Sequence, residues 1–261
     1  MTNALLQAEG LAFGYPGRRV GANLDLAVAQ GEVVCLLGPN GCGKSTLFRT
    51  LLGLIPMLAG RALLAGRELA RYTRREIACL VAYVPQAQVS TFAYTVEDIV
   101  MMGRAARVGT FAGPARRDRH AVAGALRRLG IARLASRHYT EISGGERQLA
   151  LIARALAQEA PLIVMDEPGA SLDFGNQVRV LNEIASLRAQ GMSALLSTHQ
   201  PDHALRVGDR FALMKAGRLL ACGRAVEVMT PPLLADLYEV SVSDFPASHL
   251  MPRHAPETPP P

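Results

Sequence analysis

The sequence predicts an α/β fold in which a mostly parallel β-sheet carries helices, with a helical insertion between its first and last portions. Short apolar runs alternate with longer stretches of helical periodicity. The runs Val33–Leu37 and Leu162–Asp166 are apolar almost throughout, which is typical of strands covered on both faces. The 261 residues, 49% of them hydrophobic, are enough for one large globular domain with such an insertion.

The first part of the chain predicts two strand regions before a glycine-rich turn, Gly38–Thr46, and a helix and a further strand after it. Residues 5–15 and 22–38 read as strands broken by turns, and the second stretch ends in a buried run between two glycines. A helix is expected from residue 44 to about residue 54, because Pro56 follows it. A further strand is expected to end at Pro85.

The second part predicts helices followed by the remaining strands. Residues 96–140 are expected to be mainly helical, with an interruption at 108–117. The later elements are expected in this order: helix 142–158, strand 162–166, helix 174–190, strand 193–199 and a hairpin turning at Ala216 and Gly217. We therefore expect one domain over residues 1–240, with a helical subdomain over about 88–158 inserted in its core, and a proline-rich, flexible tail over 241–261.

The composition argues against a membrane-spanning or secreted chain. The longest suspicious charge-free stretch, from Ile77 to Val96, contains Pro85 and two glutamines and does not resemble a membrane span. The first ten residues lack the basic and apolar regions of a signal peptide. The four cysteines form neither a C-x-x-C pair nor a metal-ligand grouping, which favours a reduced, cytosolic compartment.

The positive charge is concentrated in one segment. The net charge is +6, whereas residues 104–137 alone carry nine arginines and a single acid, Asp118. A nucleic-acid surface, an anionic membrane face and an ordinary solvated helical surface are all compatible with this segment. Only Lys44 and Lys215 are lysines, and Lys44 lies in the glycine-rich turn. A compact ammonium group fits between phosphate oxygens where a planar guanidinium does not.

The glycine-rich turn matches the pattern G-x-x-x-x-G-K-[ST] between a buried strand and a helix. Its glycines let backbone N–H groups face phosphates, Lys44 supplies charge to the β- and γ-phosphates, and the Ser45 hydroxyl is offered to Mg²⁺. The expected nucleotide-binding residues of this loop are Gly38, Pro39, Asn40, Gly41, Cys42, Gly43, Lys44, Ser45 and Thr46.

Two further motifs carry the same chemistry. In "LIVMDEP" a buried strand delivers Asp166 towards the Mg²⁺, and Glu167 beside it can orient and deprotonate a water aimed at the γ-phosphate. In "ISGGERQLALIARAL", Ser143 and two glycines precede an amphipathic helix, whose N-terminus is a second candidate anion site. One domain would therefore hold two phosphate-binding helix N-termini.

With these residues the chain resembles the ATP-binding subunit of an ABC transporter over residues 5–223. Five motifs occur in the order and spacing of that family: "GPNGCGKST", "YVPQ", "ISGGERQ", "MDEPGASLD" and "LLSTHQ". The resemblance implies a P-loop NTPase core with a RecA-like, mostly parallel sheet, an N-terminal antiparallel β subdomain and an inserted α-helical subdomain. It also implies that two cassettes pair head to tail, so that each ATP lies between the phosphate loop of one chain and the signature helix of the other.

The resemblance assigns the remaining site residues. Catalysis falls to Glu167, His199, Gln86 and Lys44, and the Mg²⁺ ligands are Ser45, Gln86 and Asp166. The signature residues expected to meet the partner's ATP are Ser143, Gly144, Gly145 and Glu146, and Asp173 would bridge to the partner's phosphate loop. Tyr15 is expected to stack on adenine, although Phe13 lies on the same strand face and either side chain could belong to the core.

Three residues depart from the family pattern. Ile142 replaces the usual Leu, which is a conservative change, and Gly169 replaces the usual hydroxyl residue after Glu-Pro. Glu146 stands where Gln is commonest. An acid suits the helix macrodipole there but would slightly repel phosphate.

The stretch "TFAYTVEDIVMMGR" resembles the metal-chelate importer branch, which takes up siderophores, cobalamin, haem and molybdate. The expected assembly is a homodimer of cassettes on two transmembrane permease subunits at the cytoplasmic face of the inner membrane, served by a periplasmic or lipid-anchored substrate-binding protein, with no nucleic acid. The arginine-rich segment falls in the helical subdomain, which faces the membrane subunits in this family. An exporter cassette and a soluble ABC ATPase acting on nucleic acid or ribosomes are the alternatives.

Overall fold

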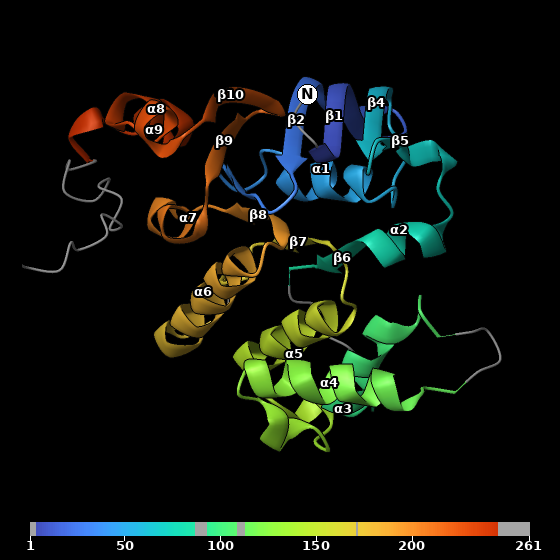
Figure 1. Cartoon of the computed structure of the whole chain (residues 1–261). Coiled ribbons are helices and arrows are strands. Elements are labelled where there is room, and N and C mark those ends of the chain that lie inside the picture. The colour runs from blue at the N-terminus through green and yellow to red at the C-terminus, as the bar shows by residue number, and fades with distance from the viewer. Residues whose placement is uncertain (1–3, 87–92, 109–112, 171, 245–261) are drawn as a thin grey trace, which may run out of the picture.

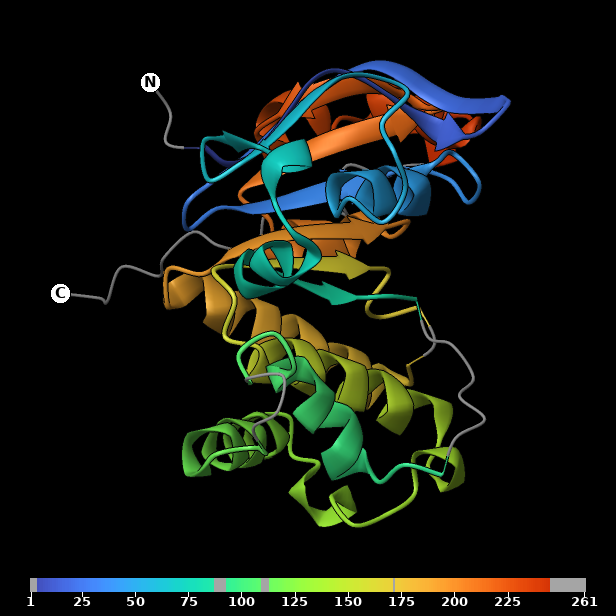
Figure 2. The same cartoon turned by 90° about the vertical axis from the view of Figure 1, so that its right-hand side faces the viewer.

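The computed structural model describes residues 4–86, 93–108, 113–170 and 172–244. Two β-sheets form the upper part of the molecule, and a group of helices lies below them (Figures 1 and 2). The strands are β1 (Ala4–Tyr15), β2 (Arg18–Ala29), β3 (Val33–Leu37), β4 (Ala59–Leu64), β5 (Arg67–Glu68), β6 (Val81–Val84), β7 (Leu162–Asp166), β8 (Ser193–Thr198), β9 (Arg210–Lys215) and β10 (Arg218–Gly223). The helices are α1 (Lys44–Leu51), α2 (Arg74–Leu80), α3 (Val96–Met101), α4 (Arg116–Arg128), α5 (Gly144–Ala157), α6 (Phe174–Ala189), α7 (Pro201–Val207), α8 (Ala225–Val228) and α9 (Pro231–Tyr238).

The two sheets have different topologies. The larger has the strand order β10-β9-β3-β8-β7-β6, and all its neighbours are parallel except β9 and β10. The smaller is antiparallel, with the order β2-β1-β4-β5. The predicted fold class is therefore confirmed. The hairpin between β9 and β10 also turns at the predicted residues, where Ala216 and Gly217 both have positive φ, as a two-residue hairpin turn of this kind requires.

The central strand β3 separates two hydrophobic cores. Val33, Cys35 and Leu37 face the core that includes α3, α4, α5 and α6, whereas Val34 and Leu36 face the core shared with the antiparallel sheet and α1. All five side chains are fully buried. The continuous apolar run thus reflects burial on both faces of the sheet, and it fixes the strand end from which the glycine-rich turn departs.

Several elements differ from the sequence expectations. The first helix ends at Leu51 and not near residue 54, because the chain turns at Gly53 with φ +64°. The strands β4 and β5 and the helices α2, α7, α8 and α9 were not predicted. Among the described residues, no helix is long and apolar enough to cross a membrane.

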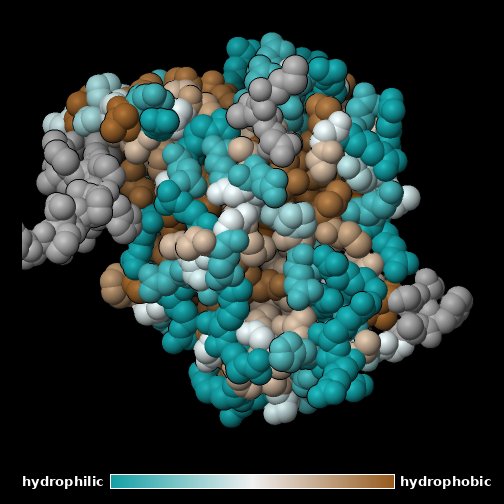
Figure 3. All heavy atoms as spheres, in the orientation of Figure 1, coloured by the Kyte–Doolittle hydropathy of each residue, from teal (hydrophilic) through white to brown (hydrophobic). Residues whose placement is uncertain are grey.

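The inserted helices α3, α4 and α5 follow β6 and precede β7. Arg104 ties them together: it is 3% exposed, its guanidinium contacts Asp118 at 2.9 Å and Glu159 at 2.7 Å, and it donates to the carbonyl of Ala157 at 2.7 Å. This arginine is therefore structural and not part of a charged surface. In contrast, Arg116, Arg117 and Arg119 of α4 are exposed, and hydrophilic atoms cover the region of this helix in Figure 3.

Parts of three expectations lie outside the described residues. The first is the start of the helical subdomain at 88–92, which includes the first two residues of "TFAYTV". The second is the expected interruption, of which residues 109–112 are not described, and the third is the expected tail, of which residues 245–261 are not described. The described end of the chain forms a short 3-10 turn, Val242–Asp244.

Candidate functional site

The glycine-rich turn joins β3 to α1 in a conformation that only glycine adopts readily. Gly41 and Gly43 have φ values of +81° and +110°. A Cβ on Gly43 would lie 2.8 Å from Cγ1 of Val20, and one on Gly38 would lie 2.3 Å from the carbonyl oxygen of Met214. No side chain caps the start of α1, so its first N–H groups remain available to an anion.

Lys44 is buried at the base of this loop. Only 5% of the residue is exposed, and its Nζ donates to the carbonyl oxygens of Gly38 at 2.8 Å and Pro39 at 3.1 Å. The same ammonium group lies 3.3 Å from Oε1 of Glu167. The loop carbonyls therefore hold the lysine where its charge meets the carboxylate at the end of β7.

Asp166 and Glu167 occupy the carboxyl end of β7. Asp166 is 2% exposed, and its Oδ1 accepts a hydrogen bond of 2.7 Å from Ser197 Oγ. The Ser197 hydroxyl in turn accepts from the backbone N–H of Glu167 at 3.0 Å. Glu167 has φ +48°, a left-handed conformation that is uncommon for a residue with a side chain. Strain of this kind occurs at functional sites, where the surrounding structure enforces it.

Ser197 was missed in the sequence analysis. The residue pairs directly with Asp166 in the register of β7 and β8, so its hydroxyl is fully buried beside both acids. The available signal was a hydroxyl side chain directly after the apolar run "ALL", in a strand expected to be buried.

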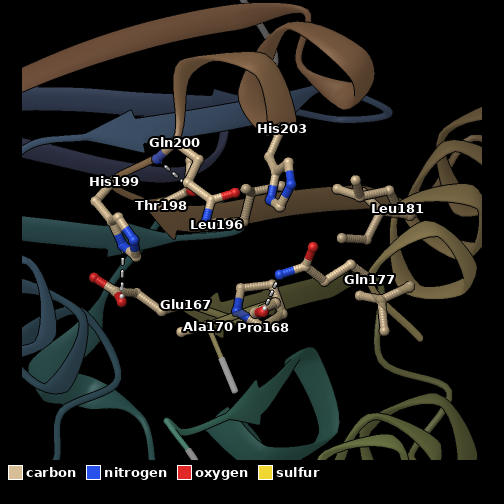
Figure 4. A pocket seen from close by; sticks show the side chains of 13 residues that line it. Glu167, Pro168, Ala170, Gln177, Leu181, Leu196, Thr198, His199, Gln200 and His203 are labelled. Atoms are coloured by element: carbon tan, nitrogen blue, oxygen red, sulfur yellow. Dashed lines mark hydrogen bonds and ion pairs between the residues drawn. The ribbon is translucent and has the colours of Figure 1, made fainter. Parts of the chain in front are cut away.

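His199 follows β8 and lies against Glu167. Its Nδ1 is 3.2 Å from Oε2 of Glu167, and Figure 4 shows the imidazole pointing towards that carboxylate. Behind them is a small cavity of about 20 Å³, lined in part by Gly169, Gln177 and His203. Burial lowers the pKa of His203. A Cβ on Gly169 would meet the closest atom, Nδ1 of His203, at 3.7 Å, which is an ordinary contact. The departure at Gly169 therefore reflects no steric requirement for glycine.

Part of the predicted nucleotide site lines one open groove of about 520 Å³, whereas Gly38, Pro39, Cys42 and Asp166 are not among its lining residues. Tyr15 is 39% exposed and lines this groove, whereas Phe13 is a fully buried core residue. The Tyr15 hydroxyl accepts a bond of 3.3 Å from Arg49. The lining residues are Tyr15, Arg18, Val20, Asn40, Gly41, Gly43, Lys44, Ser45, Thr46, Gln86 and Glu167.

Cys42 belongs to the loop but is not among the residues that line this groove. The residue is 6% exposed, and its carbonyl accepts a hydrogen bond of 3.0 Å from the N–H of Gly217 in the β9–β10 turn. Burial raises the pKa of the thiol, an effect that the nearby charge of Lys44 partly opposes. The thiol therefore packs beneath the loop as a small apolar group.

The signature residues are not part of this groove. Ser143 is the N-cap of α5, and it forms a capping box with Glu146: its Oγ accepts from the Glu146 N–H at 3.2 Å, and Oε2 of Glu146 accepts from the Ser143 N–H at 3.1 Å. Glu146 also accepts a bond of 2.9 Å from Arg133. Its carboxylate is therefore turned back onto the cap and paired with a cation. The N–H groups of Gly144 and Gly145 have no partner within the helix.

Asp173 is likewise separate from the groove lining. It is the N-cap of α6, where its Oδ1 accepts from the Asn176 N–H at 2.8 Å and its Oδ2 from the Asn176 side-chain amide at 2.9 Å. Figures 1 and 2 both place α5 among the lower helices, away from α1. One chain thus brings together the phosphate loop, Gln86, Glu167 and His199, but not the signature residues or Asp173.

We expect Glu146→Gln to retain the helix cap, because an amide oxygen can accept the same N–H bond. The variant loses the ion pair with Arg133, and its cap bond is no longer charge-assisted. The hydrogen bond that the backbone N–H of Ser143 donates to the Glu146 carboxylate is the main reason why the pKa of Glu146 lies below its usual range. A carboxyl with a lowered folded pKa stabilises the protein above its unfolded pKa of about 4.3, and this contribution is lost as the pH falls through the folded pKa.

Urea unfolding at several pH values measures this contribution. The variant should lose less than about 1 kcal/mol at pH 7. The difference from the wild type should shrink towards zero as the pH is lowered through the folded pKa of Glu146. A difference that does not change with pH would contradict the assignment.

The fold and the site together define a P-loop nucleotide-binding protein in which the second candidate anion site, the N-terminus of α5, lies outside the groove. The ABC transporter family matches residues 22–170 of the chain. An uncharacterized ABC transporter ATP-binding protein of Haemophilus influenzae is 43% identical, covering 91% of this chain and 90% of its own. The hemin import ATP-binding protein of Streptomyces coelicolor is 38% identical, covering 93% and 86%.

A solved structure described as a metal-chelate type ABC transporter in an inward-facing conformation is also similar. It has a TM-score of 0.80 at 36% identity, with 91% of this chain and 90% of that chain covered. The chain belongs to the ABC transporter family, as one of its ATP-hydrolysing cassettes.

Proposed function

We propose that this cassette powers an importer for a metal chelate, such as haem, an iron siderophore or cobalamin, or for a metal oxyanion of the molybdate type. The observation that carries this proposal is the likeness, over nine-tenths of the chain, to a hemin import subunit and to a metal-chelate type transporter. An exporter cassette and a soluble ATPase acting on nucleic acid or ribosomes are the other outcomes of the test below.

Within one chain the groove residues take complementary roles. The loop N–H groups and Lys44 hold the β- and γ-phosphates, while Tyr15 stacks on the adenine. Glu167 orients and deprotonates the attacking water, and His199, against Glu167 at 3.2 Å, contacts the γ-phosphate. The buried contact with Lys44 keeps the Glu167 carboxylate beside the place where the γ-phosphate would lie.

The residues present also fit Mg²⁺. Ser45, Gln86 and Asp166 offer hydroxyl, carbonyl and carboxylate oxygens, which this hard cation prefers. The bond from Ser197 keeps one Asp166 oxygen in an acceptor role, as an ionised ligand requires. When bound there, Mg²⁺ would neutralise charge on the phosphate oxygens.

Hydrolysis in this proposal needs two copies of the chain. The N–H groups of Gly144 and Gly145, with Ser143, would complete the γ-phosphate site of the partner's groove, and Asp173 would approach the partner's phosphate loop. The separation of these residues from the groove lining supports the pairing. Because Glu146 is held by the cap and by Arg133, its carboxylate is kept from repelling the partner's phosphate.

The rest of the assembly follows from the importer proposal. Residues 1–240 would form the cassette, with the helical subdomain over about 88–158 meeting two permease subunits at the cytoplasmic face of the membrane. A periplasmic or lipid-anchored binding protein would deliver the substrate. The exposed arginines of α4 would lie near anionic headgroups, each attracted by about 1 kcal/mol.

The importer proposal is tested with the cassette purified in complex with its permease subunits in liposomes. Binding protein loaded with haem, ferric hydroxamate, cobalamin or molybdate is added in turn, and ATP hydrolysis and uptake are measured. We expect one class of cargo to stimulate both. Transport of the cargo in the opposite direction, out of the vesicle lumen towards the side that carries the binding protein, would indicate an exporter and contradict the proposal. Stimulation of ATP hydrolysis by RNA or ribosomes alone would also contradict it.

We also expect Ser197→Ala to lower kcat by roughly tenfold or more, because the two acids lose the hydroxyl that orients them. Leaving the Glu167 N–H buried and unpaired should destabilise the fold by about 1–3 kcal/mol. Ser193→Ala is a matched control: this buried serine lies on the same strand and accepts from the N–H of Gly31 at 2.9 Å. Equal losses of kcat in both variants would show that Ser197 acts only through stability.

A further inference from the structure

The helix α9 reaches the active site from the far end of the described chain. Its last residue, Tyr238, is partly buried, and its hydroxyl donates a hydrogen bond of 2.9 Å to the backbone carbonyl of His199. Burial raises the pKa of this hydroxyl, so it stays protonated and able to donate. This contact joins a part of the chain beyond all five nucleotide motifs to the residue expected to touch the γ-phosphate.

The helix is anchored firmly enough to hold that position. Leu234 and Leu237 are fully buried, and Lys215 at the end of β9 clamps the outer side of the helix. Nζ of Lys215 donates to the Asp236 carbonyl at 2.6 Å and contacts the Asp236 carboxylate at 2.9 Å and Glu239 at 3.3 Å. Lys215 is one of only two lysines in the chain, and the nucleotide motifs gave it no role.

The anchoring strand also contacts the phosphate loop. The turn that follows Lys215 donates from the Gly217 N–H to the carbonyl of Cys42 at 3.0 Å. The same short segment therefore supports the loop on one side and α9 on the other. As a result, the position of Tyr238 is fixed relative to the groove itself.

His199 is held at two points by these contacts. Tyr238 fixes its peptide carbonyl, and Glu167 meets its Nδ1 at 3.2 Å. The residue lies between the end of β8 and the start of α7, where its own peptide makes no strand pairing in the register of β8. The residues of β8 are oriented by their hydrogen bonds to the neighbouring strands. For His199, the hydrogen bond from the Tyr238 hydroxyl takes that role.

We propose that Tyr238 is a positioning residue for hydrolysis: its hydroxyl sets the orientation of the His199 backbone, and thereby aims the imidazole at Glu167 and at the γ-phosphate. This inference rests on the proposed role of His199. Tyr238 itself is not among the residues that line the nucleotide groove.

The test compares two Tyr→Phe variants that each remove one hydroxyl bond to a backbone carbonyl. Tyr238→Phe removes the bond to His199, and Tyr72→Phe removes a bond of 2.7 Å to Leu64 in the antiparallel sheet. We expect kcat to fall by roughly tenfold in Tyr238→Phe with KM for ATP changed less than about twofold, as for an interaction lost only in the transition state. Tyr72→Phe should retain wild-type kcat at a comparable melting temperature.

A second comparison separates this inference from the role of His199. We expect His199→Ala to lower kcat strongly, and Tyr238→Phe to add no further loss in that background, since it acts through the same residue. If His199→Ala is impaired but Tyr238→Phe matches the wild type, the inference fails and the proposed role of His199 stands. If His199→Ala keeps wild-type kcat, the proposed role fails and the inference falls with it. Additive losses would assign Tyr238 a purely structural effect.

Discussion

Glu167→Gln should reduce ATP turnover by about 10²–10⁴-fold while the protein still binds ATP, because an amide can orient a water but cannot take its proton. The ion pair between Lys44 and Glu167 would also disappear, leaving the ammonium group bonded to two loop carbonyls. The charge of Lys44 would then be more available to phosphate. We therefore expect ATP affinity to be equal to or above that of the wild type.

The same variant should accumulate as an ATP-bound dimer, since the γ-phosphate that joins the two chains is no longer removed. Light scattering after gel filtration with ATP and Mg²⁺ measures the mass, and steady-state phosphate release measures turnover. Glu159→Gln, which changes an acid paired with Arg104 outside the groove, serves as the control and should turn over ATP normally. Wild-type turnover in Glu167→Gln would refute the general-base role.

The second large effect is expected for Ser143→Arg, which should abolish hydrolysis while leaving ATP binding by the monomer intact. The bulky cation would fill the space that the partner's γ-phosphate must enter. The variant also loses the N-cap of α5, which costs about 0.5–2 kcal/mol. Thr73→Arg is the matched control because Thr73 and Glu76 form the same capping box on α2.

Two measurements distinguish these variants: titration of the monomer with ATP gives its affinity, and the rate of phosphate release gives its hydrolysis. Thr73→Arg should lose stability to a similar extent and keep its activity. If Ser143→Arg instead loses ATP binding as a monomer, the signature helix acts within its own chain and the proposed pairing is wrong.

The parts of the site that the sequence predicts are those encoded by local spacing. The phosphate loop depends on glycines at fixed positions after a buried strand, and those glycines do adopt left-handed conformations in the structure. Asp166 and Glu167 follow directly from the apolar strand before them. Each of these predictions needed only a few neighbouring residues, so no knowledge of the tertiary structure was required.

The unpredicted parts depend on contacts between distant segments. Ser197 reaches Asp166 only through the register of β7 and β8, and Tyr238 reaches His199 only once α9 docks beside β9. The sequence does not distinguish Arg104 from the other eight arginines of residues 104–137, whereas the structure buries it against Asp118. The helix α2 did carry a local signal, the Thr73–Glu76 capping box, which the sequence analysis did not use.

The fold follows the same division. The apolar runs of β3 and β7 identify buried parallel strands, whereas β4 and β5 lie in a glycine-interrupted stretch, "AGRALLAGRE", without sustained alternation. The position of β4 is set by pairing with β1, a partner about fifty residues earlier in the chain, and β5 pairs with β4.

The central claim is that one ATP is held by two chains, and mixing two defective variants tests it most directly. In a Glu167→Gln background, one tagged chain carries Lys44→Ala and a differently tagged chain carries Ser143→Arg. A mixed dimer would contain one intact composite site, made from Lys44 of one chain and Ser143 of the other. We predict that ATP makes the two tags co-purify, whereas neither variant associates with itself. Failure of the mixture to associate at chain concentrations where the Glu167→Gln parent dimerises with ATP would contradict a site shared between chains.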